Sequence, residues 1–334
     1  MAKIRTWFGD SPGYNTASQG RKAVKEFKAQ GYDAIKAYNL NREVYFAVAD
    51  ESKKQNIPMI GHLASELSLE DLYHSGQSQL AHVEEITKAT IRDFGGLGYD
   101  NTEEYITYLR KNANGIAIKL KENNITISST IWLMESLPKQ KFDLHNFLKS
   151  IELPYQNPGI LERSKIAKGW LPGNNNYENS DIKNDPDKIK KSQLFWKTYV
   201  QAIHIMTKAL ADNQVTIIAG TDSNTAGVVA GFSLHDELES LSKSGLSTTQ
   251  VLQAATLAPA KWMQSDAGKI EVGYRADLVL LEKNPIEDIR NTKSIHTIIT
   301  NGRLLGRKEL DKILQSIKEV NNKSRKKSID KFVN

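Results

Sequence analysis

Four polar residues stand at or just beyond the C-terminal ends of short apolar segments. They are Lys36 in YDAIKAYN, His62 in IPMIGHL, His82 in SQLAHVEE and Asp222 in IIAGTDSN. Two neutral imidazoles and a carboxylate are ordinary zinc ligands. A desolvated lysine can lose its proton, and the neutral amine can then add carbon dioxide to form a carbamate that bridges two metals. These residue types therefore indicate a divalent-metal centre, provided that the fold brings them together.

Each of these residues, taken alone, is more often structural. A histidine at a strand end usually makes a hydrogen bond, a lysine usually keeps its ammonium group in water, and an aspartate often caps a turn. The recurrence of polar residues at equivalent strand ends is what favours a site. Nearby, Tyr38 could contact a substrate or simply pack, and Glu84 and Glu85 could orient the metal ligands.

Short strands and amphipathic helices must position these residues. Helix starts are expected at the capping-box pairs Thr16–Gln19 and Ser68–Asp71 and behind Ser247. Between the helices we expect strands at residues 33–37, 57–61, 79–82, 125–129 and 215–219. This alternation is typical of parallel βαβ units, and in a β/α barrel all strand ends meet at one mouth. A doubly wound sheet would alternate similarly, but no glycine-rich phosphate loop follows any strand.

Two regions depart from this alternation. Residues 136–188 are polar and rich in proline, and so long a connection after a strand is typical of an active-site lid, with a plain surface loop as the alternative. Later, residues 276–282 and 295–305 indicate a small β unit that turns at Asn301-Gly302. The sequence thus predicts a barrel part (1–265), a β unit (266–310) and a basic helical or disordered tail (311–334).

The composition limits the classes of function. Of 334 residues, 39% are hydrophobic and 25% charged, which fits a folded protein. Much of the net charge of +6 falls at 318–331, so we expect no nucleic-acid partner. No apolar run is long enough to span a membrane, and the absence of cysteine excludes thiolate sites. The N-terminus does not read as a signal peptide, which favours the cytoplasm by default unless the true N-terminus lies upstream.

Longer stretches of the sequence carry a resemblance to a known family. They are GYDAIK, the GH and AHVEE pair, AGTDSN, LHDELESLSKSGLSTTQVLQAATLAPAKWM, GKIEVGYRADLVLLEKNPIEDI and the closing ITNGRLL. From about Thr16 to Leu305 the chain resembles the amidohydrolase superfamily, in particular its imidazolonepropionase-like and Xaa-Pro dipeptidase-like branch. The resemblance implies an α/β fold, a partial (β/α)8 TIM-type barrel of about strands 3 or 4 to 8, with the remnant of a flanking β-sandwich.

The resemblance also implies roles for the site residues. Lys36 would be the carboxylated bridging lysine, His62 and His82 would bind metal, and Asp222 would bind metal and shuttle the proton. The implied reaction is attack of a metal-bound hydroxide on an amide, a nonstandard peptide or a cyclic amide bond of a small or dipeptide-like substrate. Lys36 favours the two-metal hydrolases of the superfamily over its single-metal deaminases, which remain the alternative.

One feature of the resembled family is missing. Its first strand carries His-x-His, and no two histidines of this sequence are two residues apart. We therefore expect one nearly complete metal position and one incomplete position, for one or two divalent ions, with zinc favoured by the ligand types. Open strand edges predict a complementing N-terminal chain or a homo-oligomer. The chain is then either a hydrolase that needs this complement, or a non-catalytic fragment acting at most as a binding module.

Overall fold

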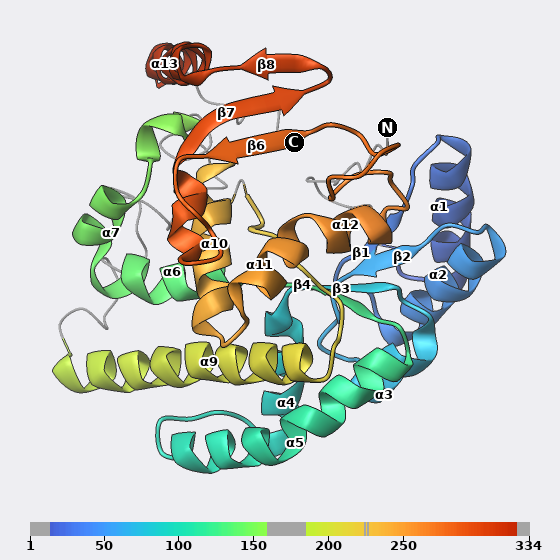
Figure 1. Ribbon diagram of the computed structural model, residues 1–334. Coiled ribbons are helices and arrows are strands. Elements are labelled where there is room, and N and C mark those ends of the chain that lie inside the picture. The colour runs from blue at the N-terminus through green and yellow to red at the C-terminus, as the bar shows by residue number, and fades with distance from the viewer. Residues whose placement is uncertain (1–13, 159–184, 224, 226, 326–334) are drawn as a thin grey trace. The chain divides into compact units, whose positions relative to one another are not determined.

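The computed structural model describes residues 14–158, 185–223, 225 and 227–325 (Figure 1). The chain divides into two compact units. The first comprises Met1–Ser129 and Gln201–Ile218, and the second comprises Thr130–Val200 and Ala219–Asn334. None of the described helices is long and apolar enough to cross a membrane.

A five-stranded parallel sheet forms the centre of the first unit. Its strands follow chain order, namely β1 (Ile35–Ala37), β2 (Met59–Gly61), β3 (Gln79–Ala81), β4 (Thr126–Ser128) and β5 (Ile217–Ile218). Every neighbouring pair is parallel. This order is that of a barrel wall, so the expected partial TIM-type fold is confirmed, although the described strands do not close into a barrel. Each strand is shorter than the apolar segment that predicts it.

Five described helices lie in the Met1–Ser129 part of the first unit, and two of them begin at the expected capping boxes. The helices are α1 (Ala17–Ala29), α2 (Arg42–Lys54), α3 (Leu69–Ser75), α4 (Val83–Phe94) and α5 (Thr102–Glu122). Thr16 and Ser68 each form a full capping box, with Gln19 and Asp71 respectively. Gly76 and Gly95 end α3 and α4 in the left-handed conformation, which glycine adopts without steric cost. The helix α9 (Pro186–Asp212) contributes its residues from Gln201 onward to this unit.

The apolar core of the first unit lies between the sheet and these helices. Leu80 on β3 and Ile127 on β4 are fully buried, as are Leu72 on α3 and Leu109 on α5. Burying one such side chain stabilises the fold by roughly 1.5–3 kcal/mol. The core therefore fixes the strand ends, which is where the candidate site residues begin.

Helices dominate the first part of the second unit. They are α6 (Ile131–Phe142), α7 (Leu144–Ser150), the 3-10 turn η1 (Leu153–Tyr155), α10 (Phe232–Lys243), α11 (Thr248–Ala255) and α12 (Leu257–Trp262). Pro138 lies inside α6 without ending it. Residues 136–150 are thus largely helical, whereas 159–184 lie outside the described residues, so the lid role of 136–188 stays a prediction. Pro259 lies within α12.

A small antiparallel sheet follows, as expected. It comprises β6 (Leu278–Leu281), β7 (Ile295–Thr300) and β8 (Arg303–Leu305), and the 3-10 helix η4 (Ile289–Lys293) precedes β7. Asn301 and Gly302 form the turn between β7 and β8, with φ of 49° and 73°. The helix α13 (Arg307–Ser324) completes the described part of the expected tail.

Candidate metal centre

Two of the predicted ligands lie side by side. His62 directly follows β2 and His82 directly follows β3, and these strands are parallel neighbours. Because parallel strands end at the same edge of a sheet, the two imidazoles meet there. Their ring centroids are 4.7 Å apart, and the ring planes are tilted by 56°. The structure thus brings together two nitrogen donors that are 20 residues apart in the sequence.

Gly61 lets the first histidine approach the neighbouring strand. Its φ is 118°, and a Cβ at this position would stand 2.2 Å from the carbonyl oxygen of Ala37 on β1. The next backbone N–H, that of His62, donates a hydrogen bond to the same oxygen at 3.0 Å. Only glycine fits this close approach. The GH dipeptide at the end of an apolar strand was the sequence signal for this position, and the tertiary contact supplies its reason.

His82 is held in an unusual environment. Its backbone has φ 74° and ψ 123°, a region that residues other than glycine rarely occupy. Its side chain is almost fully buried, with 6% exposed. Burial, reinforced by the nearby charges of His62 and Lys36, lowers the pKa of His82 to about 3. The imidazole is therefore neutral near pH 7, which is the form that binds a metal. Rare backbone conformations of this kind are often retained at functional sites.

Glu85 fixes the orientation of His62. It lies in the first turn of α4, and its Oε1 accepts a hydrogen bond from Nδ1 of His62 at 2.9 Å. Although burial alone would raise the pKa of Glu85, the hydrogen bond with His62 and the charge of Lys88 lower it below its usual value. An ionised carboxylate selects the tautomer protonated on Nδ1, which leaves the lone pair of His62 on Nε2. Of the pair expected to orient ligands, Glu85 makes this contact, whereas Glu84 pairs with Lys88 at 2.9 Å.

Tyr38 packs against His62. Its ring meets that of His62 edge to face, with centroids 4.5 Å apart and planes at 73°. The side chain is nevertheless 68% exposed, so one side of it faces solvent. This contact corresponds to the packing role considered for Tyr38, while a contact with substrate stays a prediction.

The other two predicted ligands, Lys36 and Asp222, make no hydrogen bond with the histidine pair among the described contacts. Lys36 lies on β1 between buried Ile35 and Ala37, but its own side chain is exposed among the described residues. A carbamate forms on a neutral amine, which burial favours, so the carboxylated state of Lys36 stays a prediction. Asp222 belongs to the second unit, where its carbonyl accepts hydrogen bonds from the backbone N–H and the Oγ1 of Thr225. Its place beside the histidines also stays a prediction.

The donor set fits a divalent metal in part. His62 and His82 offer two imidazole nitrogen donors at one strand edge, the type that zinc and similar ions take from proteins. Within the described ranges, however, no three His, Asp or Glu side chains are grouped so that they could hold an ion. Lys36, which lies on the strand beside β2 and whose charge acts on His82, is the further donor that the sequence predicts.

Solved structures with the same fold come from several hydrolases. A Xaa-Pro dipeptidase with bound methionine is 18% identical, with a TM-score of 0.56 over 88% of this chain and 59% of that one. Bottromycin amidohydrolase is 19% identical, with a TM-score of 0.65 over 91% and 62%. Ochratoxinase of A. niger is 18% identical, with a TM-score of 0.52 over 90% and 58%. At such identities the likeness shows the fold alone.

The chain spans about 60% of the length of these structures. Comparison with curated proteins gives no match. The model of the amidohydrolase family, in contrast, matches residues 14–305, which is most of the chain. The expected resemblance is confirmed, and the protein belongs to the amidohydrolase family.

Proposed function

We propose that this chain is the part of a metal-dependent hydrolase that carries one metal position and acts on amide, nonstandard peptide or cyclic amide bonds. The observation that carries the proposal is the pair of His62 and His82 at neighbouring strand ends. Glu85 accepts a hydrogen bond from His62, and burial keeps His82 neutral. A dipeptide-like substrate is supported by the fold shared with a Xaa-Pro dipeptidase.

Each residue has a separate task in this proposal. His62 and His82, with Lys36 as its carbamate, would hold a divalent ion, for which zinc suits the donors. When bound, that ion would lower the pKa of a water molecule and polarise the substrate carbonyl. Asp222 would take the proton from the water and return it to the leaving nitrogen. Glu85 would keep His62 in its metal-binding tautomer, and Tyr38 would line the substrate side.

The replacement His82→Asn tests the metal position. We expect the purified chain to bind a single Zn²⁺ ion weakly, and the variant to bind it at least tenfold more weakly because one of two nitrogen donors is lost. Asparagine tolerates a positive φ, so the backbone at residue 82 can keep its conformation. Isothermal titration with Zn²⁺ measures the affinity. The control is His74→Asn, since His74 is exposed and its Nδ1 lies near the backbone oxygen and the carboxylate of Glu70 on its own helix.

Two results would contradict the metal proposal. One is the binding of two tightly held ions by this chain, and the other is an unchanged affinity in His82→Asn. Catalysis is tested separately, by assaying hydrolysis of Xaa-Pro dipeptides and N-acyl amino acids with added Zn²⁺. Hydrolysis that depends on zinc and on His82 supports the enzyme, whereas release of ammonia from an aminated ring instead of amide cleavage would indicate the deaminase alternative.

Glu85→Gln tests the orienting contact. The amide can still accept from Nδ1 of His62 but carries no charge, so it selects the tautomer less strongly. We expect Zn²⁺ affinity to fall by roughly 10-fold, at the lower end of what such partners contribute. Competition with a chelating dye measures the change. Glu84→Gln is the matched control, because Glu84 pairs with Lys88 rather than with a histidine, and an equal loss in both variants would argue against a specific role.

The unpaired edges of the sheet support one further part of the proposal. Within the described residues, β1 and β5 each have a strand on one side only, and open edges of this kind tend to be covered. We propose that another polypeptide completes the sheet, either a complementing N-terminal chain or a second copy.

A second candidate is a non-catalytic family member that binds a ligand. The exposure of Lys36 favours it. Zinc binding without hydrolysis, even when the complementing chain is supplied, would support this candidate.

A further inference from the structure

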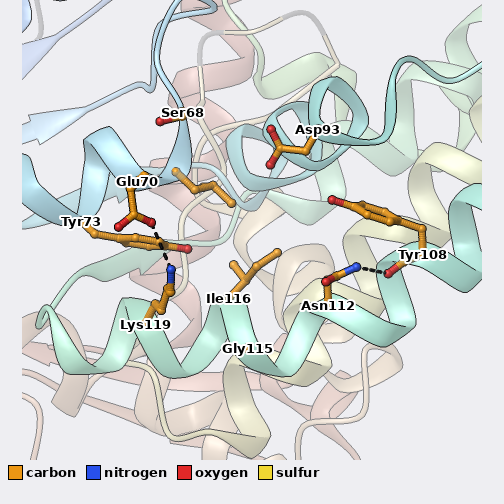
Figure 2. Close-up of a pocket in the computed structure, with 10 residues that line it drawn as sticks. Ser68, Glu70, Tyr73, Asp93, Tyr108, Asn112, Gly115, Ile116 and Lys119 are labelled. Atoms are coloured by element: carbon orange, nitrogen blue, oxygen red, sulfur yellow. Dashed lines mark hydrogen bonds and ion pairs between the residues drawn. The ribbon is translucent and has the colours of Figure 1, made fainter.

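A separate pocket lies among the outer helices of the first unit. It has a volume of about 390 Å³ and is lined by residues of α3, α4 and α5 (Figure 2). This volume is within the range of sites for small molecules. None of its lining residues belongs to the candidate metal centre. What the pocket could bind therefore has to be argued from its own side chains.

One side of the pocket already holds a cation from the chain itself. The ammonium group of Lys119 forms an ion pair with Glu70 at 3.0 Å and stands 5.3 Å from the centre of the Tyr73 ring (Figure 2). A carboxylate and an aromatic ring together are a common way to bind an ammonium group. This triad is thus an internal example of the chemistry that the pocket supports.

The other side offers the same two groups, and none of the described residues places a cation there. Asp93 and Tyr108 line it, and within the described residues Asp93 makes no hydrogen bond or ion pair. In Figure 2 the hydroxyls of Tyr73 and Tyr108 are turned toward the middle of the pocket, with the Asp93 carboxylate to one side. Burial and nearby carboxylates, including Asp93, raise the pKa of both phenols, so they stay neutral. Among the lining residues, Lys119 carries a positive charge, and Glu70 and Asp93 each carry a negative charge. The lining therefore has one net negative charge.

Gly115 keeps the floor of the pocket open. It lies well inside the 21-residue helix α5, where glycine is less favourable than any residue except proline. A Cβ at this position would meet nothing within 4 Å, so helix packing does not require glycine. Leu69 and Ile116 supply apolar wall beside this gap. The gap could thus accept an apolar group that is attached to a charged one.

We propose that this pocket binds a small organic monocation, an alkylammonium or guanidinium group that carries a compact apolar part. The carboxylate of Asp93 and the phenol of Tyr108 would receive the charge. The apolar part would lie over Gly115, against Leu69 and Ile116. This site is independent of the proposed hydrolase function and extends beyond it. The cation could come from a free amine or from a lysine side chain of a peptide, since both present the same chemistry.

The first test compares ligands of equal shape and different charge. Phenethylammonium chloride and 2-phenylethanol are titrated into the chain at matched ionic strength, with binding followed by saturation-transfer NMR. We expect the ammonium compound to bind at least tenfold more tightly than the alcohol. N-acetyl-lysine methylamide is the second arm. Tighter binding of this compound than of phenethylammonium assigns the site to a peptide side chain, and the reverse order assigns it to a free amine.

The second test uses variants of the pocket. Asp93→Asn removes the charge at an exposed position, and we expect it to weaken binding of phenethylammonium at least tenfold. Gly115→Leu fills the floor and should abolish binding. The matched control Gly115→Ala adds one methyl group in open space and should change the affinity less than twofold while raising the Tm, which also shows that the helix tolerates a side chain. Equal binding of the alcohol, or unchanged affinity in Asp93→Asn or Gly115→Leu, would overturn the proposal.

Discussion

Gly61→Ala is expected to lower the free energy of unfolding by about 4 kcal/mol, the sum of a strained φ and an overpacked contact. The φ of 118° is unfavourable for any residue with a side chain. In addition, the new methyl group would stand 2.2 Å from the oxygen and 2.8 Å from the nitrogen of Ala37, both backbone atoms that cannot rotate away. Strands β1 and β2 would have to separate at the edge where His62 begins.

Urea denaturation followed by circular dichroism measures this loss. Gly76→Ala is the matched control, because Gly76 also has a positive φ, of 79°, but no atom lies within 4 Å of its virtual Cβ. That variant should lose only about 1 kcal/mol, the cost of the left-handed conformation. Equal losses in the two variants would mean that the contact with Ala37 has no energetic weight. We also expect Gly61→Ala to weaken Zn²⁺ binding, since the hydrogen bond from His62 to Ala37 is displaced.

Glu237→Ala is expected to cost about 3 kcal/mol, because it leaves two buried N–H groups without acceptors. Glu237 is fully buried, with 0% exposed. Its carboxylate oxygens accept from the backbone N–H groups of Ile131 at 3.0 Å and Trp132 at 2.7 Å, the first residues of α6. The first N–H groups of a helix have no hydrogen-bond acceptor within the helix. A negative charge near them is also stabilised by the positive end of the helix dipole. The carboxylate therefore takes the place of a side-chain cap.

Chemical denaturation of the variants measures this contribution. Glu237→Gln keeps an acceptor but not the charge and should lose roughly half as much, since uncharged hydrogen bonds are about half as strong. Glu239→Ala, on the same helix, is the control. Glu239 pairs with Lys243 at the surface, and such pairs contribute at most about 1 kcal/mol. A Glu237→Ala variant as stable as Glu239→Ala would show that α6 does not depend on this carboxylate.

Local features of the fold were predictable from the sequence. The capping boxes at Thr16 and Ser68 form as expected, and a helix begins behind Ser247 as expected, because such caps join residues three positions apart. Strand positions followed from short apolar segments between helices. The family followed from longer stretches, which the match over residues 14–305 confirms.

The pairing of His62 with His82 was predictable in outline, since parallel strands in chain order bring their ends together. The sequence could not reveal the conformation and burial of His82, the approach of Gly61 to Ala37, or the choice of Glu85 over Glu84 as the partner of His62.

The sequence by itself thus determined the elements, the family and the candidate ligands, because each of these depends on neighbouring residues or on patterns along the chain. Only the tertiary structure decided that His82 is buried and neutral, which carboxylate orients His62, and that a pocket opens at Gly115. The physical reason is that burial and electrostatic contact depend on residues that are far apart in the chain and close in space.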